Sequence, residues 1–182
     1  MKFLQSRAAA IFTVLICILL SVFLGGKLSL APLRADALSV FTDGSDGSGK
    51  GIQYDLDQRI ETAANQIAVA ERYLSADDAG IASVSDAIFA LKNAESPSDK
   101  YAANAALTAA CTALYDTLNG MSLSEKDRTY LEGFQTELES ANQIIGHSDY
   151  NEKAAEFNAL IEKFPTGFVA LLSGVKALDL YE

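Results

Sequence analysis

The sequence predicts an all-α protein with an apolar segment near its start. Residues 8–26 form a run of 19 residues without a charged side chain. After residue 51, apolar residues recur every three or four positions and no segment alternates with a period of two, which is the pattern of amphipathic helices. Capping and turn residues then divide residues 52–165 into four helical segments.

Composition and charge exclude several classes of protein. The chain has 182 residues, of which 49% are hydrophobic, so it contains enough apolar side chains to form a core. The net charge is −10; Lys2, Arg7, Lys27 and Arg34 give +4 before the first acid, Asp36, so residues 35–182 carry −14. An acidic body does not attract phosphate backbones, and we expect no nucleic-acid partner.

The few histidines and cysteines argue against a catalytic or metal centre. The chain contains one His, His147, and two Cys, Cys17 and Cys111. These are too few for a Cys/His zinc site, a recognisable Cys/His nucleophile pair or a disulfide framework. We therefore expect no enzyme activity, no catalytic residue, no metal and no cofactor.

Residues 8–26 are predicted to form a single-pass transmembrane anchor after a short basic N-terminus, residues 1–7. As a helix this run extends ~28 Å, close to the ~30 Å hydrocarbon core of a bilayer. The alternative is a cleaved signal peptide, because Ala35-Asp36-Ala37 has the form of a cleavage site. However, the run exceeds a usual signal-peptide core, and Lys27 and Arg34 separate it from that site. We therefore expect an uncleaved signal anchor in the cell membrane.

The orientation of the anchor follows weakly from charge. Lys2, Arg7 and the amino terminus on one side nearly balance Lys27 and Arg34 on the other. An anchor so near the start of a chain usually acts as a signal anchor. We expect the amino terminus in the cytoplasm and the helical body outside it.

A juxtamembrane segment and linker, residues 27–51, is expected between the anchor and the helical body. Residues 42–51 are rich in Gly and Ser and predict a flexible tether. Gly44, Gly49 and Lys50 also fit the pattern of a phosphate-binding loop if residues 38–42 form a strand, but Gly51 stands where Ser or Thr would hold magnesium. A calcium loop is disfavoured too, because Asp43 and Asp46 are three residues apart.

Four helices are expected in residues 52–165. The first carries a stripe from Ile52 to Leu74, the second starts after Asp77 or Asp78, and the third follows a break at residues 96–99 and ends at Asn119-Gly120. Ser122 and Glu125 have the spacing of a capping box, which starts the fourth helix near residue 123. This helix extends to Phe164, before Pro165.

The stripe of the fourth helix changes phase near Gly146. The helix therefore either kinks there or has two halves that face different partners. His147, at this junction, is interpreted as a surface residue because a catalytic His needs a partner that the sequence does not supply.

The end of this helix repeats with a period of seven and forms a candidate interaction seam. The seam consists of Tyr150, Asn151, Ala154, Phe157, Asn158, Ile161, Phe164 and Pro165. A buried Asn costs stability unless it finds a partner, but it fixes register and partner choice. Replacing both Asn residues by Leu should then raise thermal stability and weaken partner capture. The alternative is two half-exposed Asn side chains on a core helix.

The seam residues, together with Tyr181-Glu182, resemble the closing signature of the LemA family, and a weaker resemblance extends over residues 52–182. This resemblance implies an antiparallel four-helix bundle tethered by one transmembrane helix. It also implies a bacterial membrane protein without an established enzymatic activity.

The remaining residues, 166–182, form an apolar C-terminal tail that is too short to cross a bilayer. We expect it to dock on the bundle. The alternative, a tail that lies on a membrane surface, is weakened because its one Lys gives little attraction to anionic lipid.

These features favour a non-enzymatic interaction or scaffold module at the cell envelope. Its partners would be the lipid bilayer, through residues 8–26, and an unidentified membrane or envelope protein that helix faces contact. The alternatives are an envelope stress or signalling component, and a secreted soluble bundle after signal cleavage. A hydrolase with carboxylates such as Glu132 and Glu139 is disfavoured, because such pairs occur on any solvated helix. The oligomeric state stays open.

Overall fold

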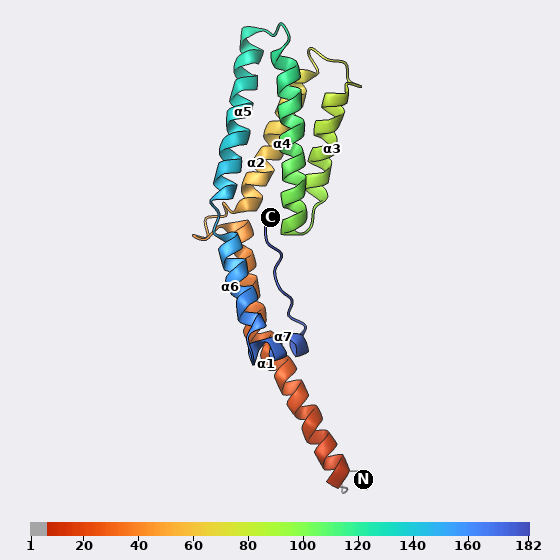
Figure 1. Cartoon of the computed structure of the whole chain (residues 1–182), viewed down its shortest axis with the longest axis vertical. Coiled ribbons are helices and arrows are strands. Elements are labelled where there is room, and N and C mark those ends of the chain that lie inside the picture. The colour runs from red at the N-terminus through yellow and green to blue at the C-terminus, as the bar shows by residue number, and fades with distance from the viewer. Residues whose placement is uncertain (1–6) are drawn as a thin grey trace. The chain divides into compact units, whose positions relative to one another are not determined.

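The computed structural model describes residues 7–182, so Lys2 of the expected basic N-terminus lies outside the described part. The prediction of an all-α protein is confirmed: seven helices and no strand are found in residues 7–182 (Figure 1). The helices are α1 (Arg7–Asp43), α2 (Ile52–Ala70), α3 (Ala79–Asn93), α4 (Pro97–Asn119), α5 (Glu125–Gly146), α6 (Tyr150–Glu162) and α7 (Thr166–Ser173).

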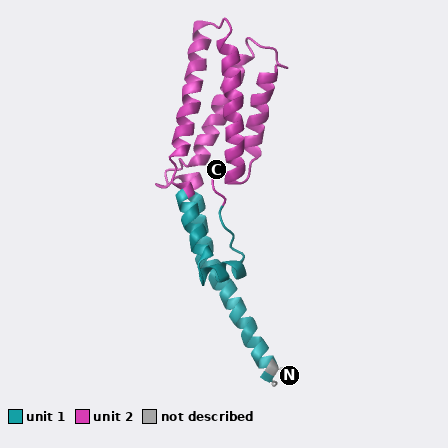
Figure 2. Cartoon of the chain, viewed as in Figure 1, with its two compact units in different colours: residues 1–39, 152–178 teal, residues 40–151, 179–182 magenta. Residues whose placement is uncertain are grey.

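The chain forms two compact units (Figure 2). Among the described residues, unit 1 consists of 7–39 and 152–178, and unit 2 of 40–151 and 179–182. Unit 1 therefore holds most of α1 and α6 together with α7, whereas unit 2 holds α2 to α5. The expected limits of the helical body, residues 52 and 165, do not coincide with the limits of either unit.

Helix α1 is longer than the expected anchor. It has 37 residues, contains Pro32 and continues to Asp43, so the segment 27–43 is helical rather than part of a linker. Residues 38–42, which a phosphate-binding loop would need as a strand, are helical as well. The helix ends at Gly44, whose φ of +75° favours glycine.

In unit 2, α2 packs against α3, α4 and α5, and α4 also packs against α3 and α5. The buried side chains between them are largely aliphatic and include Leu56, Val84, Leu107, Leu114 and Leu131. Burial of such side chains provides most of the driving force for helix packing.

Three helices of unit 2 begin with a side-chain cap from Ser or Asp, which are preferred N-cap residues. Asp78 accepts from the Gly80 amide at the start of α3, and Ser96 accepts from the Asp99 amide at the start of α4. Ser124, not the expected Ser122, caps α5 and accepts from the Asp127 amide. The sequence offered two serines two residues apart, and the structure uses the second.

The expected fourth helix is divided into α5 and α6. His147 caps the end of α5 with φ −103° and ψ 6°. The amides of His147 and Ser148 donate to the carbonyls of Ile144 and Ile145, which closes α5 before α6 begins. The phase change near Gly146 therefore marks the end of a helix rather than a kink.

Helix α2 places an arginine in the core of unit 2. Arg59 is 1% exposed, and its Nε and Nη2 donate to Asn104 Oδ1 (2.7 Å) and Thr108 Oγ1 (2.6 Å). Its Nη1 donates to the carbonyl of Leu138 on α5. Within residues 7–182, no carboxylate forms an ion pair with Arg59. No pattern in the sequence predicts that this arginine is buried.

Candidate interaction site

The two seam Asn residues both bind backbone groups of the C-terminal segment. In unit 1, the Asn158 amide group on α6 donates to the Leu178 carbonyl (2.8 Å) and accepts from the Leu178 amide (2.8 Å). Both polar groups of one residue in the C-terminal segment are thus satisfied by a single side chain. Leu178 itself is 4% exposed.

A second pair has the same geometry within unit 2. The Asn151 side chain donates to the Tyr181 carbonyl (3.0 Å) and accepts from the Tyr181 amide (2.7 Å). Its neighbour Tyr150 donates its hydroxyl to the Asp179 carbonyl (2.6 Å). We call the Asn158–Leu178 and Asn151–Tyr181 interactions the two Asn pairs.

The spacing of the two Asn pairs suits a helix beside an extended segment. Asn151 and Asn158 are seven residues apart, a rise of roughly 10.5 Å on an α-helix. Leu178 and Tyr181 are three residues apart, which is roughly 10 Å in an extended chain. Residues 175–182 contain no helix, in agreement with this match. Asn residues seven positions apart on a helix can therefore bind the backbone of residues three positions apart in an extended segment.

The aromatic member of the second pair is held by other rings. Within unit 2, Tyr181 lies 6.0 Å from Phe41 and 5.3 Å from Tyr101, measured between ring centroids. Tyr150 makes an edge contact with Phe41 at 5.1 Å. Burial raises the pKa of Tyr181 to about 12, so its phenol is neutral at physiological pH.

The remaining seam residues are placed differently from one another. Ala154 and Phe157 are buried in unit 1, and Ile161 is half-buried. Phe164 is 91% exposed, and Pro165, after a cis peptide bond, immediately precedes α7. The first half of the seam therefore packs inside the chain, whereas its end is open.

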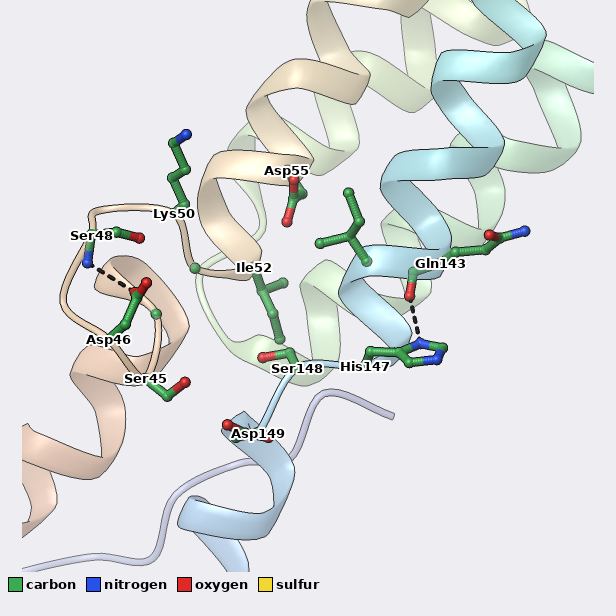
Figure 3. Close-up of a pocket in the computed structure, with 13 residues that line it drawn as sticks. Ser45, Asp46, Ser48, Lys50, Ile52, Asp55, Gln143, His147, Ser148 and Asp149 are labelled. Atoms are coloured by element: carbon green, nitrogen blue, oxygen red, sulfur yellow. Dashed lines mark hydrogen bonds between the residues drawn. The ribbon is translucent and has the colours of Figure 1, made fainter.

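The Gly/Ser-rich loop lies at a separate cleft of about 590 Å³ in unit 2 (Figure 3). The loop is closed by backbone bonds, from the Gly49 amide to the Asp43 carbonyl and from the Gly51 amide to the Thr42 carbonyl. Hydrogen bonds from the Ser48 side chain and from the Ser48 amide lower the pKa of Asp46. The loop thus has internal order that a flexible tether would not need.

Three titratable side chains line this cleft from outside the loop: Asp55, His147 and Asp149. Asp55, near the start of α2, is 9% exposed, and burial raises its pKa. His147, from the connection between α5 and α6, places its Nδ1 2.9 Å from the Gln143 carbonyl (Figure 3). Because a carbonyl only accepts, Nδ1 is the donor in this hydrogen bond.

The cleft does not assemble a recognisable catalytic or metal centre. Among residues 7–182, no group of three or more His, Cys, Asp or Glu is arranged to hold a metal ion. Asp55 and His147 lie on different walls of the cleft, and no hydrogen bond joins them (Figure 3). The loop also follows a helix, where a phosphate-binding loop follows a strand.

The heptad pattern predicts Asn151 and Asn158 as site residues but does not predict the residues that they bind. The partners Leu178 and Tyr181 are apolar side chains that take part through their backbones, which no side-chain pattern reveals. Val175, Leu178 and Tyr181 even keep a spacing of three residues that a helix would also show, so the sequence did not indicate the extended segment.

Comparison with known proteins agrees with the placement of the motif. The model of the LemA family matches residues 48–182, which include α2 to α7 and both Asn pairs. No curated protein matches the chain. Because the matched residues make up more than half of its length, the chain belongs to the LemA family.

Proposed function

We propose that this protein is a membrane-anchored, non-enzymatic interaction module of the bacterial cell envelope, with α2 to α5 as an antiparallel four-helix bundle. The observation that carries the proposal is the surface of α1. Residues 9–43 form one helix with a mean hydropathy of 2.6 over its most apolar window, and only 11% of that window is buried. Large side chains such as Phe12 and Leu24 are more than half exposed. Water disfavours such a surface, whereas lipid accepts it.

A signal sequence near an N-terminus has the same length and composition, so the packing of α1 is the further argument. Leu30 and Ala37 are buried in unit 1, which also contains α6 and α7. The expected cleavage site, residues 35–37, lies inside α1. Cleavage there would remove Leu30 from that core and expose the apolar residues that it covers. This favours an anchor that stays attached.

Fractionation of cells tests the anchor. We expect the full-length chain in the membrane pellet, resistant to alkaline carbonate and extracted by detergent. A shorter chain that begins near residue 38 and stays in the soluble fraction would refute the anchor. As a matched comparison, a variant with charged residues in the run, Leu15→Lys with Leu19→Lys, should lose membrane retention, because each charge at the centre costs roughly 2.5–3.5 kcal/mol.

The proposed protein partner is a membrane or envelope protein that contacts exposed helix faces of the bundle. Phe89 on α3 is 70% exposed, so it offers a large apolar side chain that such a partner could cover. A photo-crosslinking amino acid at position 89 should capture this partner in intact cells. The same amino acid at the polar position Lys92 on α3 is the control, and equal capture at both positions would argue against a specific face.

A further inference from the structure

Helix α7 packs against α1 at the position where the uncharged run ends. A Cβ atom on Gly26 would lie 2.7 Å from Val169 Cγ1 and 2.9 Å from Ser173 Cβ. Gly26 is the last residue of the uncharged run 8–26, and Lys27 follows it. If this run spans the hydrocarbon core, then α7 is held at the level where α1 leaves it.

The outer face of α7 is apolar and exposed. Ala170 and Ser173 are buried, with 4% and 0% of their surface exposed. On the other side, Phe168 is 56% exposed and Leu171 is 77% exposed, three residues apart as on one helix face. Phe164, 91% exposed, lies two residues before the start of this helix and adds a third exposed apolar side chain. Water is an unfavourable environment for three such neighbours.

A cationic cleft lies beside this apolar face. In unit 1, a cleft of about 430 Å³ is lined by Lys27 and Arg34 of α1 and by Lys176, which follows α7. No Asp or Glu lines it. Arg34 Nε donates to the Lys176 carbonyl (2.9 Å), which holds the two segments together. In the described part of the chain, none of these three cations forms an ion pair with a carboxylate.

We propose that α7 is a second membrane contact, which inserts Phe164, Phe168 and Leu171 into the bilayer interface while Lys27, Arg34 and Lys176 bind the phosphate of an anionic phospholipid. Apolar side chains level with the end of a transmembrane helix and cations just beyond them match the order of acyl chains and headgroups in a bilayer. The single Lys of the tail is a weak lipid site, but the fold adds two cations from α1 to it. This inference rests on the proposed anchor.

The depth of α7 can be measured because the chain contains no Trp. Three single-Trp variants of the full chain, Phe12→Trp in α1, Phe168→Trp in α7 and Phe89→Trp in α3, are reconstituted in vesicles of phosphatidylcholine and phosphatidylglycerol with brominated acyl chains. We expect quenching and blue-shifted emission for the first two variants and neither effect for Phe89→Trp.

The three variants separate failure of the inference from failure of the anchor. If Phe12→Trp is quenched and Phe168→Trp emits like Phe89→Trp, α7 does not contact lipid and the inference is wrong. If Phe12→Trp is not quenched, the anchor is wrong, and the inference is wrong with it.

The headgroup site is tested with the same Phe168→Trp reporter. At an equal, low mole fraction, brominated phosphatidylglycerol should quench the Trp emission of this variant about two or more times as strongly as brominated phosphatidylcholine, because each cation near the surface favours anionic lipid. We call this quotient the quenching ratio. Substituting Lys27, Arg34 and Lys176 by Gln should abolish this ratio, whereas Gln at Lys92, Lys100 and Lys126, an equal change in charge, should preserve it. Added salt should lower the ratio in the chain with all its cations. The headgroup site would be refuted by a quenching ratio near one in the chain with all its cations. It would also be refuted if Gln at Lys27, Arg34 and Lys176 left the ratio unchanged.

Discussion

Replacement of Asn158 by Ala should release the C-terminal segment from α6. The side chain makes two hydrogen bonds with the backbone of Leu178, one as donor and one as acceptor. An Asn without a partner would cost stability, and its replacement by Leu would raise thermal stability. Because Asn158 has two partners, we expect its replacement to lower stability instead. Here, removal of the amide leaves two backbone groups of a buried residue without partners.

The magnitude follows from two opposing terms. Two hydrogen bonds at about 1 kcal/mol each contribute about 2 kcal/mol. Asn to Ala within a helix regains about 0.6 kcal/mol of helix propensity, which leaves a net loss of about 1.4 kcal/mol. Asn65→Ala is the matched control, because Asn65 is exposed within α2 and no hydrogen bond of its side chain is found in the described residues. The difference between the two variants isolates the hydrogen-bond term.

Amide hydrogen exchange of the full chain in lipid nanodiscs measures this difference where it arises. A loss of about 2 kcal/mol in local stability corresponds to roughly 30-fold faster exchange of the Leu178 amide in Asn158→Ala. Asn151→Ala should have the same effect at the Tyr181 amide, which donates to Asn151. If the Leu178 amide exchanges at the same rate in Asn158→Ala and Asn65→Ala, the Asn pair does not hold the segment.

Other features predict further outcomes. Gly26→Ala should lower the thermal midpoint by overpacking against α7, at a cost of about 1–3 kcal/mol, whereas Gly25→Ala, with open space around it, should not. Hydrogen bonds from Tyr73 and Ser124 lower the pKa of Asp127, so Asp127→Asn should destabilise the protein at neutral pH, and the difference should vanish as the pH falls through that lowered pKa. Burial raises the pKa of Asp55, so Asp55→Asn should instead stabilise the protein at neutral pH. This gain should disappear below the unfolded-state pKa of 3.8, where the carboxyl group is protonated in both states. Denaturant titrations at several pH values measure the change in stability for both Asp variants. Burial raises the pKa of Cys111 to about 11, so it should resist alkylation near neutral pH until the protein unfolds.

Local signals in the sequence predicted most helix limits in unit 2. Asp78 and Ser96 cap the helices that follow them, and the phase change near Gly146 coincides with the end of α5. These signals work because a cap satisfies backbone groups only a few residues away. The sequence does not predict the extension of α1 through Lys27 and Arg34, because charged residues end the apolar run there, although Leu and Ala between them favour a helix.

The long-range contacts could not be predicted in this way. Asn158 binds a residue 20 positions away through that residue's backbone, and nothing in the side chain of Leu178 indicates it. The burial of Arg59 also depends on distant residues. A cation in a helical sequence predicts an exposed face, and Arg59 is buried because α4 and α5 supply acceptors for its guanidinium.

The buried guanidinium of Arg59 also restricts how α2, α4 and α5 can be arranged. Its acceptors are two side chains of α4 and one carbonyl of α5, so each of the three helices has one permitted axial position relative to the others. A slide by one turn, about 5.4 Å, would leave a charge without acceptors in an apolar interior. Substitutions at solvent-facing positions of these helices should therefore leave the alignment of the interior unchanged.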